Sequence, residues 1–357
     1  MKRVILCVTN DLSTDQRVHK IATTLSKKLE YEVLLVGRKL KQSPLIKRDY
    51  TTKRLKLVFT KGPLFYFFFN FRLFLFLLFN KVDIIVSNDL DTLPGSAMAA
   101  KIKRKRLFYD SHELFTEVPE LIHRKRVQRI WEKLERKYIK CVDEFYTVCK
   151  PIADLYTEKY GKKVKVVRNV SLKKDSLQIE KYEKPTLIYQ GALNLGRGID
   201  LMIDTMAFLP NYQLIIVGKG DLEKELKVKA QKLGANNIDF KGYVSFEELH
   251  ELTSRAHIGL SWEENLGLNY YYALPNKVFD YIQARIPVLV SNLPGLKSII
   301  EEHGVGEMLN NRTPEKIGAQ IERLFEKRHT FDDALKNAAR ELIWEKEQEI
   351  LIDIYTS

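Results

Sequence analysis

Short apolar runs alternate with polar, helix-like segments through the first half of the chain. The runs are rich in β-branched and aromatic residues, as expected of buried strands. The predicted strands are VILCVT, EVLLVG, LKLVF (55–59), DIIVSN, RLFYD, EFYTVC and KVKVV. Helices are predicted over 91–102, around 124–140 and from Lys150. This alternation is typical of a parallel sheet covered by helices on both faces.

The alternation breaks in the polar stretch SLKKDSLQIEKYEKP (171–185) and then resumes. The second series predicts the strands TLIYQ, QLIIVG, NIDFKG, HIGLSW and PVLVS, and helices opening near Gly196 and near 220–233, 245–254 and 276–284. Because 357 residues exceed one ordinary core, we expect two Rossmann-like doubly wound α/β domains, 1–170 and 171–339. Ligands of such sheets bind beyond the carboxyl ends of the strands, so we expect the two sets of strand-end loops to face each other across a cleft.

One segment, PLFYFFFNFRLFLFLLFN (63–80), is packed with Phe and Leu. As a helix, its apolar part from Leu64 to Phe79 would reach about 24 Å, short of the roughly 30 Å hydrocarbon core, and it carries Asn70 and Arg72. A transmembrane helix is therefore not expected. A signal peptide is not expected either, because the segment is internal and the chain opens on a strand-like pattern. Two alternatives remain, a helix buried on most sides or a helix with one face left for lipid.

Positive charge is concentrated in the first half of the chain. The formal net charge is +13, and residues 1–170 hold 36 Lys and Arg against 18 Asp and Glu, whereas residues 171–357 hold 23 against 28. The basic residues cluster at KIKRKR (101–106) and HRKRVQR (123–129), followed by Lys133, Arg136, Lys137 and Lys140. Solvated helix faces would explain them. Nucleic acid is the weaker of the specific alternatives because no helix-turn-helix, zinc-finger or RNP-like motif lies nearby, whereas a polybasic patch beside an apolar helix suits an anionic membrane surface.

The three cysteines, Cys7, Cys141 and Cys149, have no metal-ligand spacing. Reduced thiols in a cytosolic protein are therefore expected.

The loops after the first-half strands carry candidate polar groups. NDLSTDQRVHKIA lacks the G-x-G-x-x-G of a nicotinamide or flavin site, and Ser13, Thr14 or Asp15 could cap the next helix. In NDLDT, Asp89 and Asp91 fit either a metal-binding pair or helix capping. His112 and Glu113 follow RLFYD, and the histidine is either structural or functional.

The second half contains loops suited to an anion. YQGALNLGRGIDLMI places a Gly-rich turn and Arg197 where a helix should begin, and IIVGKGD is a further glycine turn. Asn276 and Lys277 follow Pro275 at another predicted helix start, with Asp280 one turn later. A phosphate beside Lys277 and a ribose on Asp280 would make a nucleoside diphosphate site, although the two residues could equally be an exposed i, i+3 pair.

Four of these segments, in the same order and spacing, resemble one family. NDLSTDQRVHKIA, FYDSHELFTEVPEL, IYQGALNLGRGID and NYYYALPNKVFDYIQARIPVLVSN resemble the retaining glycosyltransferases of family 4, also called group 1, which have the GT-B fold. The resemblance runs from about residue 3 to the helix at Trp344. It implies that the helix of about 340–357 packs back on the first domain, which binds the acceptor, and that 171–339 bind a nucleotide sugar.

The resemblance also implies site residues. Catalytic roles fall on His112, Arg197 and Lys277, and no nucleophile is assigned. Donor binding falls on Gly191, Gly196, Arg197, Gly218, Tyr243, Val244, Asn276, Lys277 and Asp280. The N-domain side of the cleft is expected to contain Leu12, Ser13, Asp15, Arg17, Asp89 and Glu113. No metal or other cofactor is expected. The chain departs from the family pattern at Tyr272, where the first acid of E-x7-E should be, at Ala192 in place of an Arg, and at Asp280 in place of a Glu.

The expected function is transfer of a sugar from a UDP- or GDP-linked donor, with retention of configuration. The acceptor would be a glycan or lipid-linked glycan in surface polysaccharide or glycolipid biosynthesis. The enzyme would be cytoplasmic and peripheral on the inner face of the membrane, through the basic first half and residues 64–79. The alternatives are a GT-B sugar-nucleotide epimerase and a non-catalytic nucleotide- or membrane-binding module.

Overall fold

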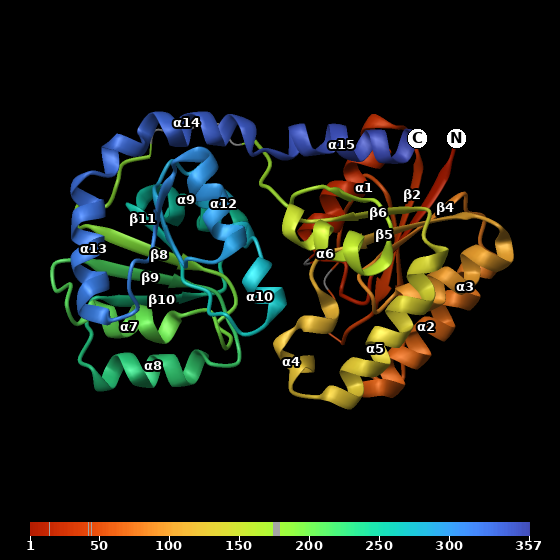
Figure 1. Ribbon diagram of the computed structural model, residues 1–357, viewed down its shortest axis with the longest axis horizontal. Coiled ribbons are helices and arrows are strands. Elements are labelled where there is room, and N and C mark those ends of the chain that lie inside the picture. The colour runs from red at the N-terminus through yellow and green to blue at the C-terminus, as the bar shows by residue number, and fades with distance from the viewer. Residues whose placement is uncertain (14, 42, 44, 174–178) are drawn as a thin grey trace. The chain divides into compact units, whose positions relative to one another are not determined.

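The computed structural model describes residues 1–13, 15–41, 43, 45–173 and 179–357 (Figure 1). The chain divides into two compact units: Met1–Asn169 together with Glu347–Ser357, called the N-domain, and Val170–Lys346, called the C-domain. The boundary expected between residues 170 and 171 lies one residue away. The helix expected around 340–357 is α15 (Trp344–Thr356), most of which belongs to the N-domain.

The N-domain contains a seven-stranded parallel sheet in the order β3-β2-β1-β4-β5-β6-β7. Its strands are β1 (Arg3–Cys7), β2 (Glu32–Arg38), β3 (Thr51–Leu55), β4 (Ile84–Asn88), β5 (Arg106–Ser111), β6 (Glu144–Thr147) and β7 (Val164–Val166). Every residue of β4 is buried, because helices cover both faces of the sheet.

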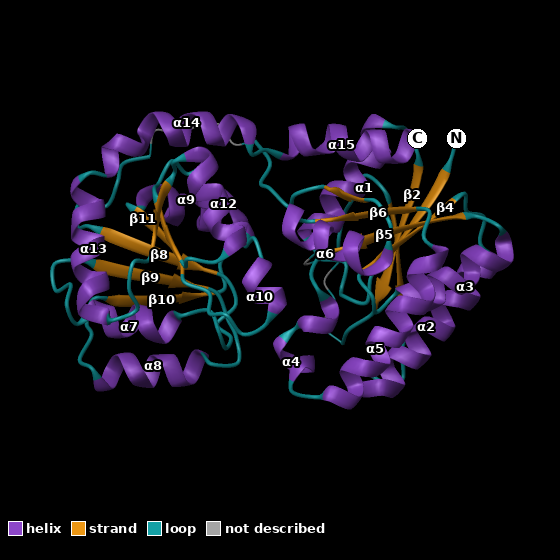
Figure 2. Ribbon diagram, viewed as in Figure 1, coloured by secondary structure: helices purple, strands orange, loops and turns teal. Residues whose placement is uncertain are grey.

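Helices lie on both faces of this sheet (Figure 2). One face is covered by α2 (Gly62–Phe79), α3 (Leu93–Lys103), α5 (Lys125–Tyr138) and α6 (Lys150–Tyr160), and the other by α1 (Gln16–Lys28) and α15; α4 (Pro119–Ile122) is a single turn. On the first face, Glu135 of α5 accepts a hydrogen bond from Tyr156 of α6. On the second, Tyr355 of α15 bonds Tyr146 of β6 at 3.0 Å and packs on Phe108 of β5.

The C-domain repeats the plan with six parallel strands in the order β10-β9-β8-β11-β12-β13. The strands are β8 (Thr186–Gln190), β9 (Gln213–Val217), β10 (Ile238–Gly242), β11 (Ile258–Ser261), β12 (Val288–Val290) and β13 (Gly306–Met308). One face is covered by α7 (Ile199–Met206), α8 (Glu223–Lys232) and α13 (Pro314–Glu326), which share one apolar core. The other carries α9 (Phe246–Arg255), α11 (Asn276–Gln283), α12 (Pro294–His303) and α14 (Asp332–Glu341), and α10 (Leu268–Tyr272) is a short helix after β11.

The expected fold class, two Rossmann-like doubly wound α/β domains, is confirmed. That their strand-end loops face one another across a cleft stays a prediction. The three cysteines are all among the described residues and form no disulfide.

Two expectations are wrong. The predicted strand 55–59 is displaced, because β3 is Thr51–Leu55 and Val58 is 87% exposed. Because β3 is an edge strand, its positions alternate between exposed and covered, and its sequence has no continuous apolar run. Its backbone nevertheless pairs with β2. The alternative that α2 is buried on most sides also fails, since only Phe65, Phe69, Leu73 and Leu77 of its 18 residues are buried.

Candidate active site

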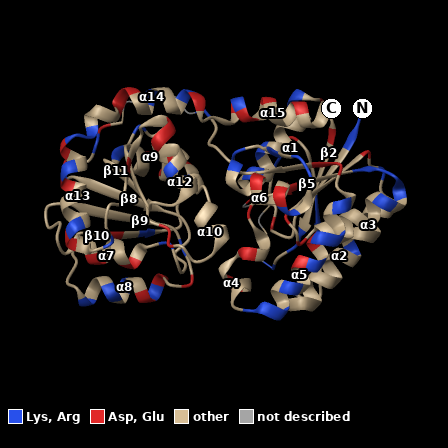
Figure 3. Cartoon of the chain, in the orientation of Figure 1, with Lys and Arg blue, Asp and Glu red and all other residues tan. Residues whose placement is uncertain are grey.

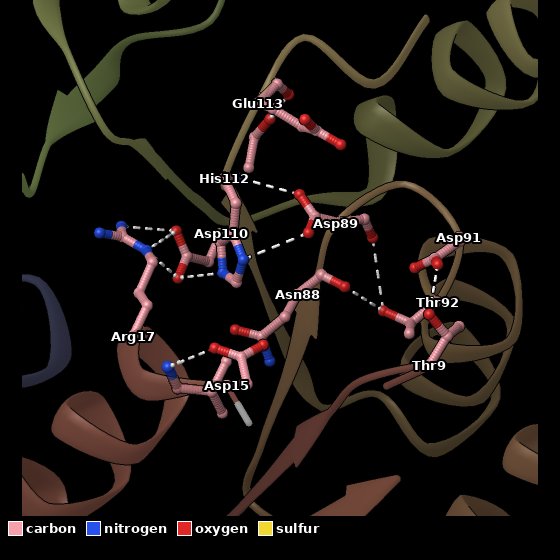
Figure 4. Close-up of polar contacts among 12 residues, drawn as sticks. Thr9, Asp15, Arg17, Asn88, Asp89, Asp91, Thr92, Asp110, His112 and Glu113 are labelled. Carbon is pink, nitrogen blue, oxygen red and sulfur yellow. Dashed lines mark hydrogen bonds and ion pairs between the residues drawn. The ribbon is translucent and has the colours of Figure 1, made fainter. Parts of the chain in front are cut away.

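Polar side chains gather where three neighbouring N-domain strands end. The loop after β1 carries Thr9 and Asp11, the loop after β4 carries Asp89 and Asp91, and His112 follows β5 (Figure 4). Since β1, β4 and β5 are adjacent in the sheet, their carboxyl ends bring these groups to one edge. We call this the N-domain site.

His112 lies between two carboxylates. Its Nδ1 is 3.2 Å from Asp89, its Nε2 is 3.1 Å from Asp110, and its backbone N–H donates to Asp89 at 2.8 Å. Burial alone would lower the pKa of His112, but Asp89 and Asp110 outweigh it and raise that pKa to about 10. The two carboxylates therefore favour the charged form of the ring and fix its position from both sides.

Arg17 holds Asp110 from the other side. Its Nε and Nη2 donate to the two oxygens of Asp110 at 2.9 and 2.7 Å, and its Nη1 donates to the carbonyl oxygen of Val167 at 2.7 Å. Both side chains are buried, and burial, which favours the neutral acid, is outweighed by Arg17 and His112, so the pKa of Asp110 is lowered. Arg17 is set at the start of α1 by Asp15, whose carboxylate caps the helix by accepting from Val18 N at 3.0 Å. The capping alternative for Asp15 is thus confirmed.

Neither Asp89 nor Asp91 caps α3, so the capping alternative is wrong for both. The carboxylate of Asp89 is directed at His112, and that of Asp91 accepts a hydrogen bond from Thr9. Within the described part of the chain, no group of three or more His, Cys, Asp or Glu could hold a metal ion around them. Burial raises the pKa of Asp91 to about 7.

The other residues predicted for the N-domain lie around the same edge of its sheet. Ser13 donates to Asp11 from both its backbone N–H and its hydroxyl, and Asp11 also pairs with Arg54 at 3.1 Å. Glu113 directly follows His112, and its backbone oxygen accepts from Ser111. Leu12 is buried, with 1% of the whole residue exposed.

In the C-domain, glycine turns at the ends of β8 and β9 lie against each other. Gly191 has φ +138° and its N–H donates to Val217 O, while a Cβ on Gly218, at φ +137°, would lie 1.9 Å from Gly191 O. The turns therefore require glycine at both positions. Lys277 of α11 lies beside this cradle, its Cε 3.5 Å from where a Gly191 Cβ would be.

Two cations converge on one buried carboxylate, Glu263. Lys277 Nζ lies 2.9 Å from Glu263 Oε1, and Arg197 Nη1 lies 3.7 Å from the same oxygen. Glu263 is 1% exposed and Lys277 8%, whereas Arg197 is 27% exposed. Burial opposes the charge of Glu263, but Lys277 and Arg197 keep its pKa below the usual value. Glu263 thus lies beneath the two cations and leaves Arg197 the more accessible.

Aromatic rings complete the surroundings of these cations. Lys277 Nζ lies 4.1 Å from the ring centre of Tyr189, and the Arg197 guanidinium lies 4.8 Å from that of Tyr270. Arg197 precedes α7, which begins at Ile199 after Gly198, so it lies two residues before the helix rather than in it.

Asp280 is not an exposed partner of Lys277. Its two oxygens accept from Ser171 and from Gln190 Nε2, the latter at 2.7 Å. Gln190 in turn accepts from Thr253 at 2.9 Å. The exposed-pair alternative is therefore wrong, and Asp280 is held at the end of β8.

The remaining predicted donor residues surround this region. Asn276 is exposed in the first turn of α11, Gly196 is buried beside Arg197, and Tyr243 is 73% exposed with Val244 half-buried after β10. The structure therefore brings Arg197 and Lys277 together around Glu263, with Gly191 beside Lys277 and Gly218 beside Gly191. We call this cluster the C-domain site.

Sequence reasoning missed Glu263, Asp110 and Asp11. Each is a buried acidic residue at or just after the end of a strand. This position in the sequence is the feature that could have identified them. Their partners lie far away in sequence: Arg17 is 93 residues before Asp110.

Chemically, the C-domain site suits an anion with several oxygens, because a guanidinium and an ammonium are close together. The N-domain site is rich in carboxylates, which accept hydrogen bonds from hydroxyl groups. The C-domain site therefore suits an anion, and the N-domain site suits a polyol.

Comparison with family models divides the chain in the same way as the structure. A model described as Glycosyltransferase Family 4 matches residues 15–170, and one described as Glycosyl transferases group 1 matches residues 173–342. The first match falls in the N-domain and the second in the C-domain.

Individual relatives are more distant. The chain is similar to EpsD of Bacillus subtilis (strain 168), with 28% identity over 148 residues, or 40% of this chain and 36% of EpsD. It is also similar to the chitobiosyldiphosphodolichol beta-mannosyltransferase of Yarrowia lipolytica, with 25% identity over 147 residues, or 39% of this chain and 31% of that protein. The matches thus span about a third of each relative.

Solved structures match over the whole chain. Sucrose-phosphate synthase of Thermosynechococcus elongatus has a TM-score of 0.77 at 15% identity, over 100% of this chain and 98% of that one. Anabaena HepE, solved with UDP and glucose, has a TM-score of 0.76 at 14% identity over 100% of both chains. At this identity the likeness establishes a shared fold.

Proposed function

Because the chain is a GT-B glycosyltransferase, with a family 4 N-domain and a group 1 C-domain, we propose that it transfers a sugar from a nucleotide-diphosphate sugar to an acceptor hydroxyl. The donor would be UDP- or GDP-linked, and the anomeric configuration would be retained. Retention rests on the family resemblance alone.

The observation that carries this proposal is the pair of cations beside the Gly191–Gly218 cradle. Departure of the nucleotide develops negative charge on the β-phosphate, and fixed cations and dipoles stabilise that charge best in a dry site. Arg197 and Lys277 lie around one oxygen of Glu263, at 3.7 and 2.9 Å, so both are already oriented before any donor binds. They would supply the charge that a divalent metal supplies elsewhere, and we therefore propose a metal-free reaction.

Asp280, held by Gln190, would bind the ribose, and Gly218 with Tyr243 and Val244 would lie near ribose and base. In the N-domain, Asp91 and Asp89 would accept hydrogen bonds from the acceptor sugar. His112 is fixed by Asp89 and Asp110 and would supply a positive charge near the transferred sugar.

The acceptor would be a glycan or a lipid-linked glycan of a surface polysaccharide or glycolipid pathway. This choice is supported by the exposed apolar face of α2 and the basic face of α5, both in the domain assigned to the acceptor. The enzyme would then work at the cytoplasmic side of a membrane.

Thermal denaturation with UDP, GDP, ADP and their sugars tests donor binding. A nucleotide at 100 times its dissociation constant stabilises the folded chain by about 2.7 kcal/mol. Lys277→Met should abolish the shift, whereas Lys297→Met, which alters an exposed lysine of α12, should leave it intact. If none of these nucleotides shifts the wild-type chain, the proposal fails.

Product analysis separates the transferase from its alternatives. A transferase releases nucleoside diphosphate faster when an acceptor is added, an epimerase changes the nucleotide sugar without one, and a binding module does neither. A nucleic-acid binder would show affinity for nucleic acid that falls steeply with salt.

A further inference from the structure

Helix α2 is apolar enough to enter a membrane, but the two strands that it connects prevent it from spanning one. Within the described residues, Gly62–Phe79 is the one helix long and apolar enough to span a bilayer. It connects β3 to β4, and both are parallel strands of the same sheet. A spanning α2 would place the two strands on opposite sides of the bilayer, so it can span only if the sheet is broken.

The inner side of α2 is fixed to the N-domain. Phe65, Phe69, Leu73 and Leu77, spaced four apart, are buried. Asn70 accepts from Gly95 N at 2.8 Å and donates to Asp91 O at 2.8 Å. Lys103 of α3 donates to the last carbonyl groups of α2. The helix therefore cannot roll to hide its other side.

The outer side of α2 remains apolar and exposed. Leu64, Phe67 and Phe71 follow one another at helical spacing and are 52%, 63% and 49% exposed. Phe79, the last residue of the helix, is 85% exposed, and Arg72 is also exposed. Beside them, the exposed Phe59 stacks on Phe68. A row of exposed aromatic rings on a soluble domain marks a surface that meets another apolar phase.

Helix α5 presents cations in the same layer. Figure 1 shows α2, α3 and α5 side by side on one face of the sheet, and Tyr66 of α2 meets Trp131 of α5 edge-on at 5.0 Å. The side of α5 away from the sheet contains an open hollow of about 450 Å³, lined by Arg129, Glu132, Lys133, Arg136, Lys137 and Lys140. Figure 3 shows Lys and Arg positions along α5. On that side Ile130 is 58% exposed, so apolar groups accompany the charges.

We propose that these outer sides of α2 and α5 form one docking face for an anionic lipid bilayer, with α2 lying flat in the interface. The Phe rings of α2 enter the boundary between headgroups and acyl chains, and the α5 cations bind lipid phosphates. Neither signal holds a protein firmly alone, whereas the two together do. The cation row favours an anionic bilayer over an apolar protein surface, since five cations and one carboxylate around the hollow need anionic partners.

The inference deepens the proposed function and rests on it for its purpose, which is to bring the N-domain to a membrane-borne acceptor. The docking itself depends only on the N-domain surface. It can therefore be tested apart from donor binding.

Vesicle sedimentation with the full chain tests the face. Wild type should bind vesicles of phosphatidylglycerol and phosphatidylcholine, and bind pure phosphatidylcholine at least about tenfold more weakly. Phe67→Glu with Phe71→Glu, and separately Lys133→Glu with Lys137→Glu, should each weaken binding to the anionic vesicles at least about tenfold. Matched controls on exposed positions of or beside α8, Val228→Glu with Leu233→Glu and Lys224→Glu with Lys232→Glu, should leave it unchanged.

Three results overturn the inference: wild type that stays in the supernatant, equal binding to neutral and anionic vesicles, or α2 and α5 variants that bind like wild type. A stable dimer abolished by the Phe variants, without vesicle binding, would instead assign the face to a second copy. Nucleotide-induced thermal shifts measured on the same variants keep the two proposals apart. Vesicle binding without any nucleotide shift would refute the proposed function alone, and a shift without vesicle binding would refute the docking face alone.

Discussion

Lys277→Met tests the buried charge cluster of the C-domain. The substitution keeps a long side chain but removes the ammonium, so Glu263, which is 1% exposed, loses the partner at 2.9 Å. Removing one member of a buried ion pair costs about 3–5 kcal/mol. We expect the lower end, about 3 kcal/mol, because Arg197 stays 3.7 Å from the same oxygen.

This cost has a measurable size. In a domain of 150–250 residues, 1 kcal/mol moves the melting temperature by roughly 2–4 °C, so the C-domain transition should fall by about 6–12 °C. Calorimetry on the full chain is the assay, since the two domains can melt separately. Lys297→Met is the control, because Lys297 pairs with Glu301 at the surface, and its loss should cost less than about 1 kcal/mol.

The double variant Glu263→Gln with Lys277→Met decides the cause. It removes both buried charges, so it should be more stable than Lys277→Met alone, with a coupling free energy of about 1–3 kcal/mol. The reasoning is refuted if Lys277→Met destabilises no more than Lys297→Met, or if the costs of the two single variants simply add.

Three further predictions concern other positions. The pKa of His112 is raised to about 10 from an ordinary 6.5, so its contribution to the free energy of unfolding is full below pH 6.5 and is lost as the pH rises towards 10. His112→Gln should therefore remove the fall in the free energy of unfolding between these pH values, measured by urea titration. An unchanged pH dependence in the variant would contradict this. Arg17→Met removes the guanidinium that pairs with the buried Asp110 and should lower the free energy of unfolding by about 3–5 kcal/mol in urea. Arg17→Lys should recover only part of that stability. Wild-type stability in Arg17→Met would disprove this. Gly218→Ala places a Cβ 1.9 Å from Gly191 O and should lower C-domain stability by more than about 2 kcal/mol. The control Gly234→Ala is also at positive φ but has open space around it, so it should cost about 1 kcal/mol. Equal melting temperatures of the two variants would count against the cradle.

The doubly wound architecture could be predicted because its central strands are buried on both faces. Such strands, β1 and β4 among them, are nearly continuous apolar runs that stand out from the helices between them. The edge strand β3 lacks this signal, and the apolar residues after it, including the exposed Val58, attracted the prediction instead.

For α2, composition alone could not decide between a buried and an exposed helix. Apolar residues occur on all its sides, so periodicity gives no inner face. Its orientation is set by two polar residues. Asn70 bonds Asp91, in the loop after β4, and Gly95 of α3, and Lys103 of α3 bonds a carbonyl group near the end of α2.

The sequence indicated the candidate site residues that follow strands. It did not indicate those whose role depends on pairing with residues far away in the chain. Arg197, Lys277 and His112 were proposed from their positions after strands or at a helix start. Glu263 joins Lys277 and Arg197 from 14 and 66 residues away, and Asp110 ties His112 to Arg17 across the sheet. A single sequence shows such acids as strand-end residues without naming their partners.

Helix α15 has a consequence for how the chain is made. Tyr355 is fully buried against Phe108 and Tyr146, so a structural part of the N-domain core is translated only after the whole C-domain. During synthesis, the first 169 residues therefore leave the ribosome before α15 can cover Phe108 of β5 and Tyr146 of β6. Nascent chains stalled before residue 344 should engage chaperones through these uncovered residues, and release should follow once the last helix has docked.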